Sequence, residues 1–449
     1  MLSAFSNSLK IPELRQRIGF TLAMVFVCRI VAAVPTPGVD AVALKEAIDA
    51  AAQSAQGGFL SLANLFSGGA LERCAVGALG IMPYISASII LQLMTAVVPT
   101  LERLSREGDT GREKITQYTR YLTLVLCVVQ GYAWAVTLEN PQALFGIDAT
   151  LVANPGMPFR LLTIVVMGTA TMLLMWLGEQ ITERGIGNGI SLIITIGIIS
   201  GMPGAVHSAV LMFNPSEGPA QFSVFHLVGL LLMLFLVVAG TIAVTQAQRK
   251  IPVHYAKRVV GRKVYGGQST YMPLRVNYSG VMPIIFAQAI LMFPARIFGM
   301  MPFEIAKRIG AAIDFGTMWY NILYASLIFF FSYFWVATQF NPIQIADDLK
   351  KYGGYLPGIR PGRPTAEFLD RTMTRITFAG ALFLTVIATI PNLMYQQFSI
   401  PFLVAQFFGG TSLLIIVGVV LDTMRQIESH LLMRNYDGFL KKGKLRGRR

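Results

Sequence analysis

Long apolar stretches separated by short polar segments dominate the pattern of this chain. Ten of them are close to the roughly 20 residues that an α-helix needs to cross a bilayer, and none has an Asp or Glu near its centre. They lack the strict alternation of a transmembrane β-strand. We therefore expect an all-α polytopic membrane protein with spans at 18–35, 75–98, 119–138, 160–178, 188–208, 224–246, 280–298, 318–340, 374–391 and 402–424.

Composition and charge placement support this class and give an orientation. Of the 449 residues, 54% are hydrophobic and 13% are charged, about half the charged share of a soluble protein. Thirty of the 37 Lys and Arg residues lie in or beside one set of alternating segments, and six lie in or beside the other set. By the positive-inside rule, we expect both termini and the basic loops on the cytoplasmic side.

The chain divides evenly around residue 214, with five spans before it and five after it. We expect an N-terminal half at 1–213 and a C-terminal half at 214–449, and an inverted repeat of five plus five spans is one possible arrangement. No small-residue cleavage site follows the first stretch, so we expect it to stay in the mature protein. Cys28, Cys74 and Cys127 are isolated and are expected to be inert packing residues.

The external segment 36–74 contains a short apolar run, Phe59–Phe66, followed by Gly68 and Gly69. The run is too short to span a bilayer. Two interpretations stay open: a re-entrant helix on a glycine hinge that leads into the second span, or an interfacial helix lying on the outer surface.

Two basic loops and a basic tail carry more pattern than topology requires. In 247–279, β-branched and aromatic residues alternate with Lys and Arg, which predicts a β-hairpin that presents cations. Within the loop 341–373, glycines and prolines in the run Lys350–Pro364 predict a stiff, non-helical segment, and the tail at 425–449 is basic. Such a surface suits a large polyanion or an acidic protein, with anionic lipid as the competing partner.

No enzyme signature is present. The chain contains no P-loop and no HExxH, and its four histidines are scattered. The sequence therefore predicts no catalytic residues, no cofactor and no metal site.

Polar residues within apolar spans are costly and so draw attention. Gln92, Gln130 and Gln288 either line a polar seam or make ordinary interhelical hydrogen bonds, and Arg29 is expected to snorkel toward the interface. Isoleucines recur one turn apart at 81, 85 and 89, and again at 190 and 194. Such a face either lines a hydrophobic constriction or packs against lipid and protein.

Four motifs together resemble the SecY family, the central subunits of bacterial protein-conducting channels. They are Gly80–Ile90, Gly178–Ser191, Tyr255–Lys263 and Pro357–Gly362, and the resemblance extends over essentially the whole chain. It implies two pseudo-symmetric five-helix halves, arranged as a clamshell around an hourglass pore with a short plug helix.

The resemblance also assigns roles to residues. The pore ring would be Ile81, Ile85, Ile190, Ile194, Ile285 and Ile415. The plug, at about 59–71, would include Phe59, Leu62, Leu65, Phe66, Gly68 and Gly69. The lateral gate would include Gln92, Gln130, Ala289 and Phe293, and a docking surface would include Arg258, Arg262, Lys263 and Arg360.

The implied function is translocation of unfolded secretory polypeptides across the bacterial cytoplasmic membrane and lateral release of apolar segments into it. The implied partners are SecE and SecG, the motor ATPase SecA, the translating ribosome with its RNA and proteins, signal sequences and nascent polypeptides, YidC and SecDF, and anionic lipids. Two other classes share the helix count: a small-solute transporter, which would need an ionisable or broken-helix site at the midplane, and a membrane scaffold or insertase component.

Overall fold

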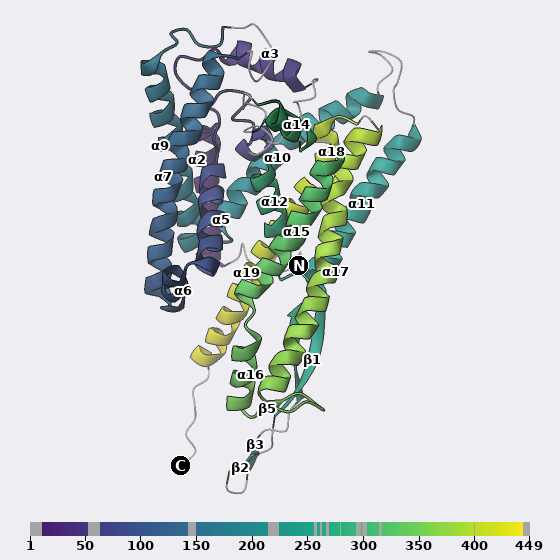
Figure 1. Cartoon of the computed structure of the whole chain (residues 1–449). Coiled ribbons are helices and arrows are strands. Elements are labelled where there is room, and N and C mark those ends of the chain that lie inside the picture. Colours follow the sequence, from purple (N-terminus) through teal and green to yellow (C-terminus); the bar gives the residue numbers. More distant parts are fainter. Residues whose placement is uncertain are drawn as a thin grey trace. The chain divides into compact units, whose positions relative to one another are not determined.

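The computed structural model of the chain forms two compact units (Figure 1). Unit 1 comprises Met1–Gly218 and Ile415–Arg449, and unit 2 comprises Pro219–Leu414. The structure describes residues 11–52, 63–141, 150–213, 224–255, 258–260, 263–265, 269–278, 280–292, 298, 303–313, 317–398 and 400–442. The predicted boundary at 213–214 falls where the last helix of the first half ends.

Unit 1 is a helical bundle organised around α9. Its helices are α2 (Pro12–Val31), α3 (Ala41–Ala52), α5 (Met82–Val97), α6 (Pro99–Arg106), α7 (Asp109–Glu139), α9 (Met157–Arg184), α10 (Gly189–Phe213) and, from Ile415 on, α19 (Thr411–Lys442). Helices α2, α5, α7 and α10 all pack against α9. Pro99 starts α6, which turns by 103° from α5, because proline suits the first turn of a new helix but cannot continue an old one.

The turn between α9 and α10 is fixed by small residues and by bonds from two other helices. A Cβ on Gly189 would lie 1.9 Å from the carbonyl oxygen of Gly178, so only glycine fits there. The Thr21 hydroxyl of α2 accepts the Ile186 N–H, and the Gln426 side chain of α19 accepts the Gly187 N–H. One of the motifs singled out in the sequence is therefore a clamped turn.

Unit 2 combines helices with a small antiparallel sheet. The helices are α11 (Val224–Gln246), α12 (Met282–Met292), α14 (Glu304–Ala312), α15 (Met318–Gln339), α16 (Pro342–Lys351), α17 (Arg363–Phe398), α18 (Phe402–Gly409) and the first turn of α19. The strands are β1 (Gln248–Tyr255), β2 (Arg258–Val260), β3 (Lys263–Tyr265), β4 (Ser269–Arg275) and β5 (Gly354–Tyr355). Helix α17 packs against α11, α15, α16 and α18.

A helix lies at each of the ten predicted spans. Among the described residues, six helices are long and apolar enough to cross a membrane, or up to eight if each bent pair counts as one span. Helix α2 has 20 residues, but Arg15, Arg17 and Arg29 leave at least three charged residues in every stretch of 18. Helix α12 has 11 residues, and residues 293–297 lie outside the described part. The predicted class, a mostly helical multi-span membrane protein, is confirmed.

The predicted β-hairpin in 247–279 is confirmed, and it is part of a larger sheet than expected. Strands β1 and β4 pair antiparallel from Gln248↔Arg275 to His254↔Ser269. Strand β5, from the other basic loop, adds to the free edge of β1 through His254↔Tyr355 and Tyr255↔Gly354. The order β4-β1-β5 therefore joins two segments that the sequence had presented as separate loops.

A shared apolar core holds this sheet on α17. Ile251, Val253 and Leu274 of the sheet and Leu356, just after β5, are buried with Leu369, Met373 and Ile376 of α17. Burial of apolar side chains is the main stabilising term for such a small body, since three strands have few hydrogen bonds of their own.

Truncation of Leu356 to alanine should loosen this body, because Leu356 is 1% exposed in its core. Loss of a buried leucine costs about 2–5 kcal/mol. We expect trypsin to cleave after the neighbouring Lys350 and Lys351 at least about tenfold faster in membranes. The matched control is Ile343→Ala, because Ile343 is 66% exposed. Equal cleavage rates in the two variants would contradict the shared core.

Candidate functional site

Residues 63–80 form a compact segment between α3 and α5 in unit 1. Residues 63–67 are helical, and the chain then turns through Gly68 and Gly69, with φ of 68° and 82°. Side chains close the turn: the Asn64 amide donates to the Glu72 carboxylate at 3.1 Å, and the Glu72 N–H donates back to the Asn64 side-chain oxygen at 3.1 Å. Two of the predicted plug residues, Leu65 and Phe66, are 6% exposed. Phe59 and Leu62 lie outside the described residues.

Two helices of the bundle hold this segment. The Arg29 guanidinium of α2 donates from Nη1 to the Gly68 carbonyl oxygen at 3.0 Å. The Ser200 hydroxyl of α10 lies 3.1 Å from the same oxygen. The expectation that Arg29 snorkels toward the interface is therefore wrong, because the arginine has a backbone partner within the protein.

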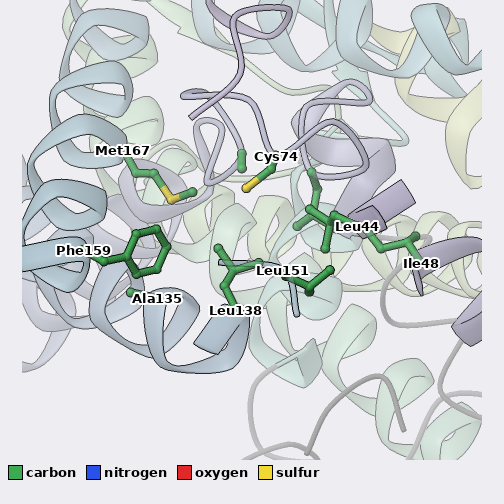
Figure 2. Packing of buried hydrophobic residues seen from close by; sticks show 10 residues of the cluster. Leu44, Ile48, Cys74, Ala135, Leu138, Leu151, Phe159 and Met167 are labelled. Carbon is green, nitrogen blue, oxygen red and sulfur yellow. The ribbon is translucent and has the colours of Figure 1, made fainter. Parts of the chain in front are cut away.

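Helix α3 and the ends of α7 and α9 cover the other side of the segment (Figure 2). Leu44 and Ile48 of α3 gather with Cys74, Leu138 and Phe159 into one buried cluster. The Thr36 N–H donates to the Cys74 carbonyl at 2.8 Å, and the Val76 N–H donates to Val34 at 2.8 Å. The irregular backbone here is thus paired and packed, as a segment shielded from water requires.

The four predicted ring isoleucines of unit 1 occur as two pairs, each one turn apart. Ile81 and Ile85, at the start of α5, are 2% and 5% exposed. On α10, Ile194 is 3% exposed and Ile190 is half-buried. Both helices pack on α9, so one scaffold positions the two pairs.

Ile81 and Ile190 face two different hollows. Ile81 lines a cavity of about 30 Å³ together with Arg29, Phe66 and Ser67, directly beside the 63–80 segment. Ile190 lines a cleft of about 660 Å³. The cleft lies at the opposite end of α7 and α9 from the 63–80 segment, since it is lined by the start of α7 and the end of α9.

The large cleft is strongly polar. Arg120 of α7 donates to both carboxylate oxygens of Glu179 on α9, at 3.1 and 2.7 Å. Its other charged lining residues are Asp109, Arg112, Glu113 and Glu183. Ile190 is the apolar aliphatic residue among the residues that line this cleft.

The predicted gate residues are described within their own units. In unit 1, Gln92 donates from Nε2 to the Ser88 hydroxyl at 3.3 Å, while its buried Oε1 has no hydrogen-bond partner among the described residues. Gln130 on α7 is half-buried. In unit 2, Ala289 of α12 is 3% exposed, and Phe293 lies outside the described residues.

The remaining ring candidates are buried as well. Ile285 of α12 in unit 2 is 4% exposed, and Ile415 of α19 in unit 1 is 1% exposed. Gln288 is buried on α12, one helical turn after Ile285. Like Gln92, it has a buried Oε1 without a hydrogen-bond partner among the described residues. Unpaired buried amide oxygens are uncommon and mark positions where a partner is to be expected.

The predicted docking residues lie in or beside two sheets of unit 2, the β4-β1-β5 sheet and the separate two-stranded sheet β2-β3. Arg258 starts β2 and Lys263 starts β3, whereas Arg262 lies outside the described residues. Arg360 is exposed in the turn after β5. The sheet edge also presents features that the sequence did not single out: the exposed aromatic residues Tyr271, Tyr352 and Tyr355 and the exposed cations Arg249, Lys250 and Arg275.

Three comparisons with known proteins agree. Residues 75–424 match the SecY family model. The chain is 46% identical over 439 residues to the protein translocase subunit SecY of Escherichia coli K12, covering 97% of this chain and 96% of that protein. It is 45% identical to the SecY subunit of Streptomyces coelicolor, covering 98% of this chain and all of that protein.

Solved structures with a similar fold include proteins of the same kind. One is described as a protein-conducting channel, with a TM-score of 0.57 at 16% identity, covering 93% and 92% of the two chains. Another is a SecY protein whose plug domain is described as stabilising the closed state, with a TM-score of 0.58 at 17% identity. A third is Sec61 in the canine ribosome–channel complex, with a TM-score of 0.52 at 15% identity over the same coverage.

The burial of the native thiols gives a direct chemical test. Cys74 is 0% exposed, and this burial raises the pKa of its thiol to about 11. Below that pKa the thiol is protonated, so at pH 8 only about one in a thousand molecules would hold the reactive thiolate. We expect Cys74, Cys28 and Cys127 to resist maleimide in native membranes and to react after denaturation. Arg73→Cys, next to Cys74 but exposed, should be labelled readily. Fast labelling of the unmodified chain would show that the cluster around Cys74 is open.

Proposed function

The chain belongs to the SecY family of protein translocase subunits, and from this premise we propose how its residues form, close and serve a path for polypeptides. It is a protein-conducting translocation channel and a multi-pass membrane protein, a transporter and not an enzyme. Its bacterial relatives support placing it in the cytoplasmic membrane, with both termini and the basic loops on the cytoplasmic side.

The observation that carries the proposal is that two predicted ring residues of unit 1 line different hollows. Ile81 lines a small cavity beside the 63–80 segment, and Ile190 lines a wide polar cleft at the other end of α7 and α9. We assign the cleft to the cytoplasmic vestibule and the 63–80 segment to the plug. The waist is then the ring of Ile81, Ile85, Ile190, Ile194, Ile285 and Ile415.

An isoleucine ring suits this task physically. Apolar side chains around a narrow opening exclude water, so ions would have to shed their hydration shells to pass. Isoleucine side chains also adapt to a translocating chain, because they offer no fixed hydrogen bond that a passing residue would have to satisfy. The plug adds a second barrier on the far side of the ring.

The lateral gate is the proposed route by which apolar segments leave the channel into the lipid. We assign Gln92, Gln130, Ala289 and Phe293 to this gate, where a signal sequence enters as an apolar helix and separates the halves. The buried, unpaired amide oxygen of Gln92 supports this assignment. Apolar segments of the nascent chain then partition sideways into lipid, while polar segments continue through the pore.

The sheet body of unit 2 is the proposed docking surface for the cytoplasmic partner that supplies energy. A structural neighbour is described in complex with the ribosome. Exposed cations and tyrosines on one rigid sheet suit ribosomal RNA, by phosphate contact and stacking, and also an acidic surface of a motor such as SecA. SecE and SecG are the proposed small partner subunits, and YidC, SecDF and anionic lipids are further expected partners.

A photocrosslinker at Ile85 tests the waist. We expect it to crosslink to an arrested secretory chain only when that chain has a functional signal sequence. A probe at Glu183, in the proposed vestibule, should crosslink as well, and a probe at Val125, 56% exposed on α7, should not. Crosslinks from Glu183 without any from Ile85 would contradict the assignment of the waist.

Charge reversal tests the docking surface. Arg360→Glu should reduce translocation by about tenfold or more in membranes supplied with the cytoplasmic motor, because it places repulsion where attraction steers docking. Arg308→Glu is the matched control, since Arg308 is equally exposed in unit 2 but lies on the predicted external side. The two variants should differ most at low ionic strength, where charge is least screened. Similar translocation rates at low salt would rule out Arg360 as a docking residue.

A further inference from the structure

Arg29 occupies an unusual position for a charged residue. It lies in the last turn of α2, within a predicted span, where an unpaired cation is costly. No carboxylate is bonded to it among the described residues. Its guanidinium instead donates to the carbonyl oxygen of Gly68, 39 residues away in the plug segment, at 3.0 Å. A bond of this kind is stronger than one between neutral groups, because the donor is charged.

The same carbonyl oxygen has a second donor within reach. The Ser200 hydroxyl lies 3.1 Å from it and 2.6 Å from the carbonyl of Gly197, so a single proton can serve either acceptor. Gly68 thus receives bonds from α2 on one side and α10 on the other. This is the point where the plug segment is tied to the bundle by side chains of two different helices.

The approach of the backbones at this point leaves no room for side chains. A Cβ on Gly68 would lie 2.6 Å from Arg29 Nη1 and 2.9 Å from the Gly197 Cα. Gly68 also has φ of 68°, a conformation that L-residues adopt only with strain. Gly80, with φ of 57°, ends the segment just before the ring residue Ile81. The fixed point therefore lies within a chain segment that has glycine at both ends.

The surroundings allow the bond to be exchanged. Arg29 lines the cavity of about 30 Å³ next to Phe66, Ser67 and Ile81, which is large enough for about one or two water molecules. If the plug leaves, water can solvate the guanidinium in place of the Gly68 carbonyl. The net cost of breaking the bond is then small enough for a gating step.

We propose that Arg29 is the latch of the plug, a positioning residue that holds Gly68 against α10 in the closed channel and releases it when the channel opens. The proposal rests on the assignment of 63–80 as the plug. Ser200 is a second hydrogen-bond donor to Gly68. The close contact between Gly68 and Gly197 is where the plug segment rests on α10 in the closed channel. An arginine in the first span thereby sets the balance between closed and open states without touching the translocating polypeptide.

Two readouts on the complete translocase complex test this latch. The first is the ion conductance of the resting complex in planar bilayers. The second is the rate at which a maleimide labels Ala63→Cys, a reporter on the plug helix, after subtraction of any labelling of the chain without it. A residue that only supports the fold would change the yield of the complex, but it would not change both the conductance and the labelling rate.

We expect Arg29→Gln to raise both the resting conductance and the labelling rate by about tenfold, which is the scale of one charge-assisted hydrogen bond. Arg29→Lys, which keeps a charged donor, should restore most of the closure. Ser200→Ala should give a smaller increase and provides the test if Arg29→Gln fails to accumulate. The matched control is Arg17→Gln: Arg17 is an exposed arginine at the other end of the same helix, α2, outside the 63–80 segment, and its replacement should change neither readout.

Deletion of residues 63–70 separates failure of the latch from failure of the plug assignment. If the deletion raises conductance but Arg29→Gln and Ser200→Ala leave both rates at the wild-type value, the latch is wrong and the plug assignment stands. If the deletion itself leaves the resting conductance unchanged, the plug assignment fails and the latch fails with it. An increase in both readouts for Arg29→Gln, with none for Arg17→Gln, supports the proposal.

Discussion

The structure of unit 1 depends on pairing the polar backbone groups of one irregular segment inside the protein. In a bilayer, non-helical backbone is tolerated only where protein or a water-filled cavity surrounds it. Residues 63–80 meet this requirement through bonds to α2, its following turn and α10: the Gly77 N–H reaches Val31, the Val76 N–H reaches Val34, and the Gly68 carbonyl receives Arg29. Glycines let the backbones approach closely enough for those bonds to form. The plug assignment, the small cavity and the position of Ile81 all follow from this arrangement.

The two ends of unit 1 differ in polarity and in the size of their cavities. At the end that holds residues 63–80, the Arg29 guanidinium bonds to a backbone carbonyl within the protein, and the cavity beside it is small. At the other end, charged side chains line a wide cleft, and the Arg120–Glu179 pair lies at its wall. A channel that must stay hydrated up to its waist and dry at its waist needs this change in polarity over a short distance. In the proposed channel, isoleucines one helical turn apart form this boundary.

Much of the fold could be predicted from the sequence because its signals are local. Hydropathy located helices at all ten predicted spans, and alternation of β-branched with basic residues located the hairpin of β1 and β4. Contacts between distant segments could not be predicted in this way. The pairing of β5 with β1 involves a strand of only two residues, Gly354 and Tyr355, too short to have a period. The Arg29–Gly68 bond joins a side chain to a backbone carbonyl. Every residue has such a carbonyl, so the sequence does not show which one accepts the bond. The short helices α3 and α14 lie in segments predicted only as external connections.

The union of the two basic loops has a mechanical consequence. Leu369, Met373 and Ile376 fasten the β4-β1-β5 sheet to the first half of α17, and close-packed interiors yield little under load. A force that a partner exerts on the sheet is therefore transmitted to α17, a helix of 36 residues, Arg363–Phe398. That helix in turn packs against α11, α15 and α18. The sheet is therefore mechanically connected to the helices of unit 2. A force applied to it at the membrane surface can be transmitted through α17 to helices inside the bilayer.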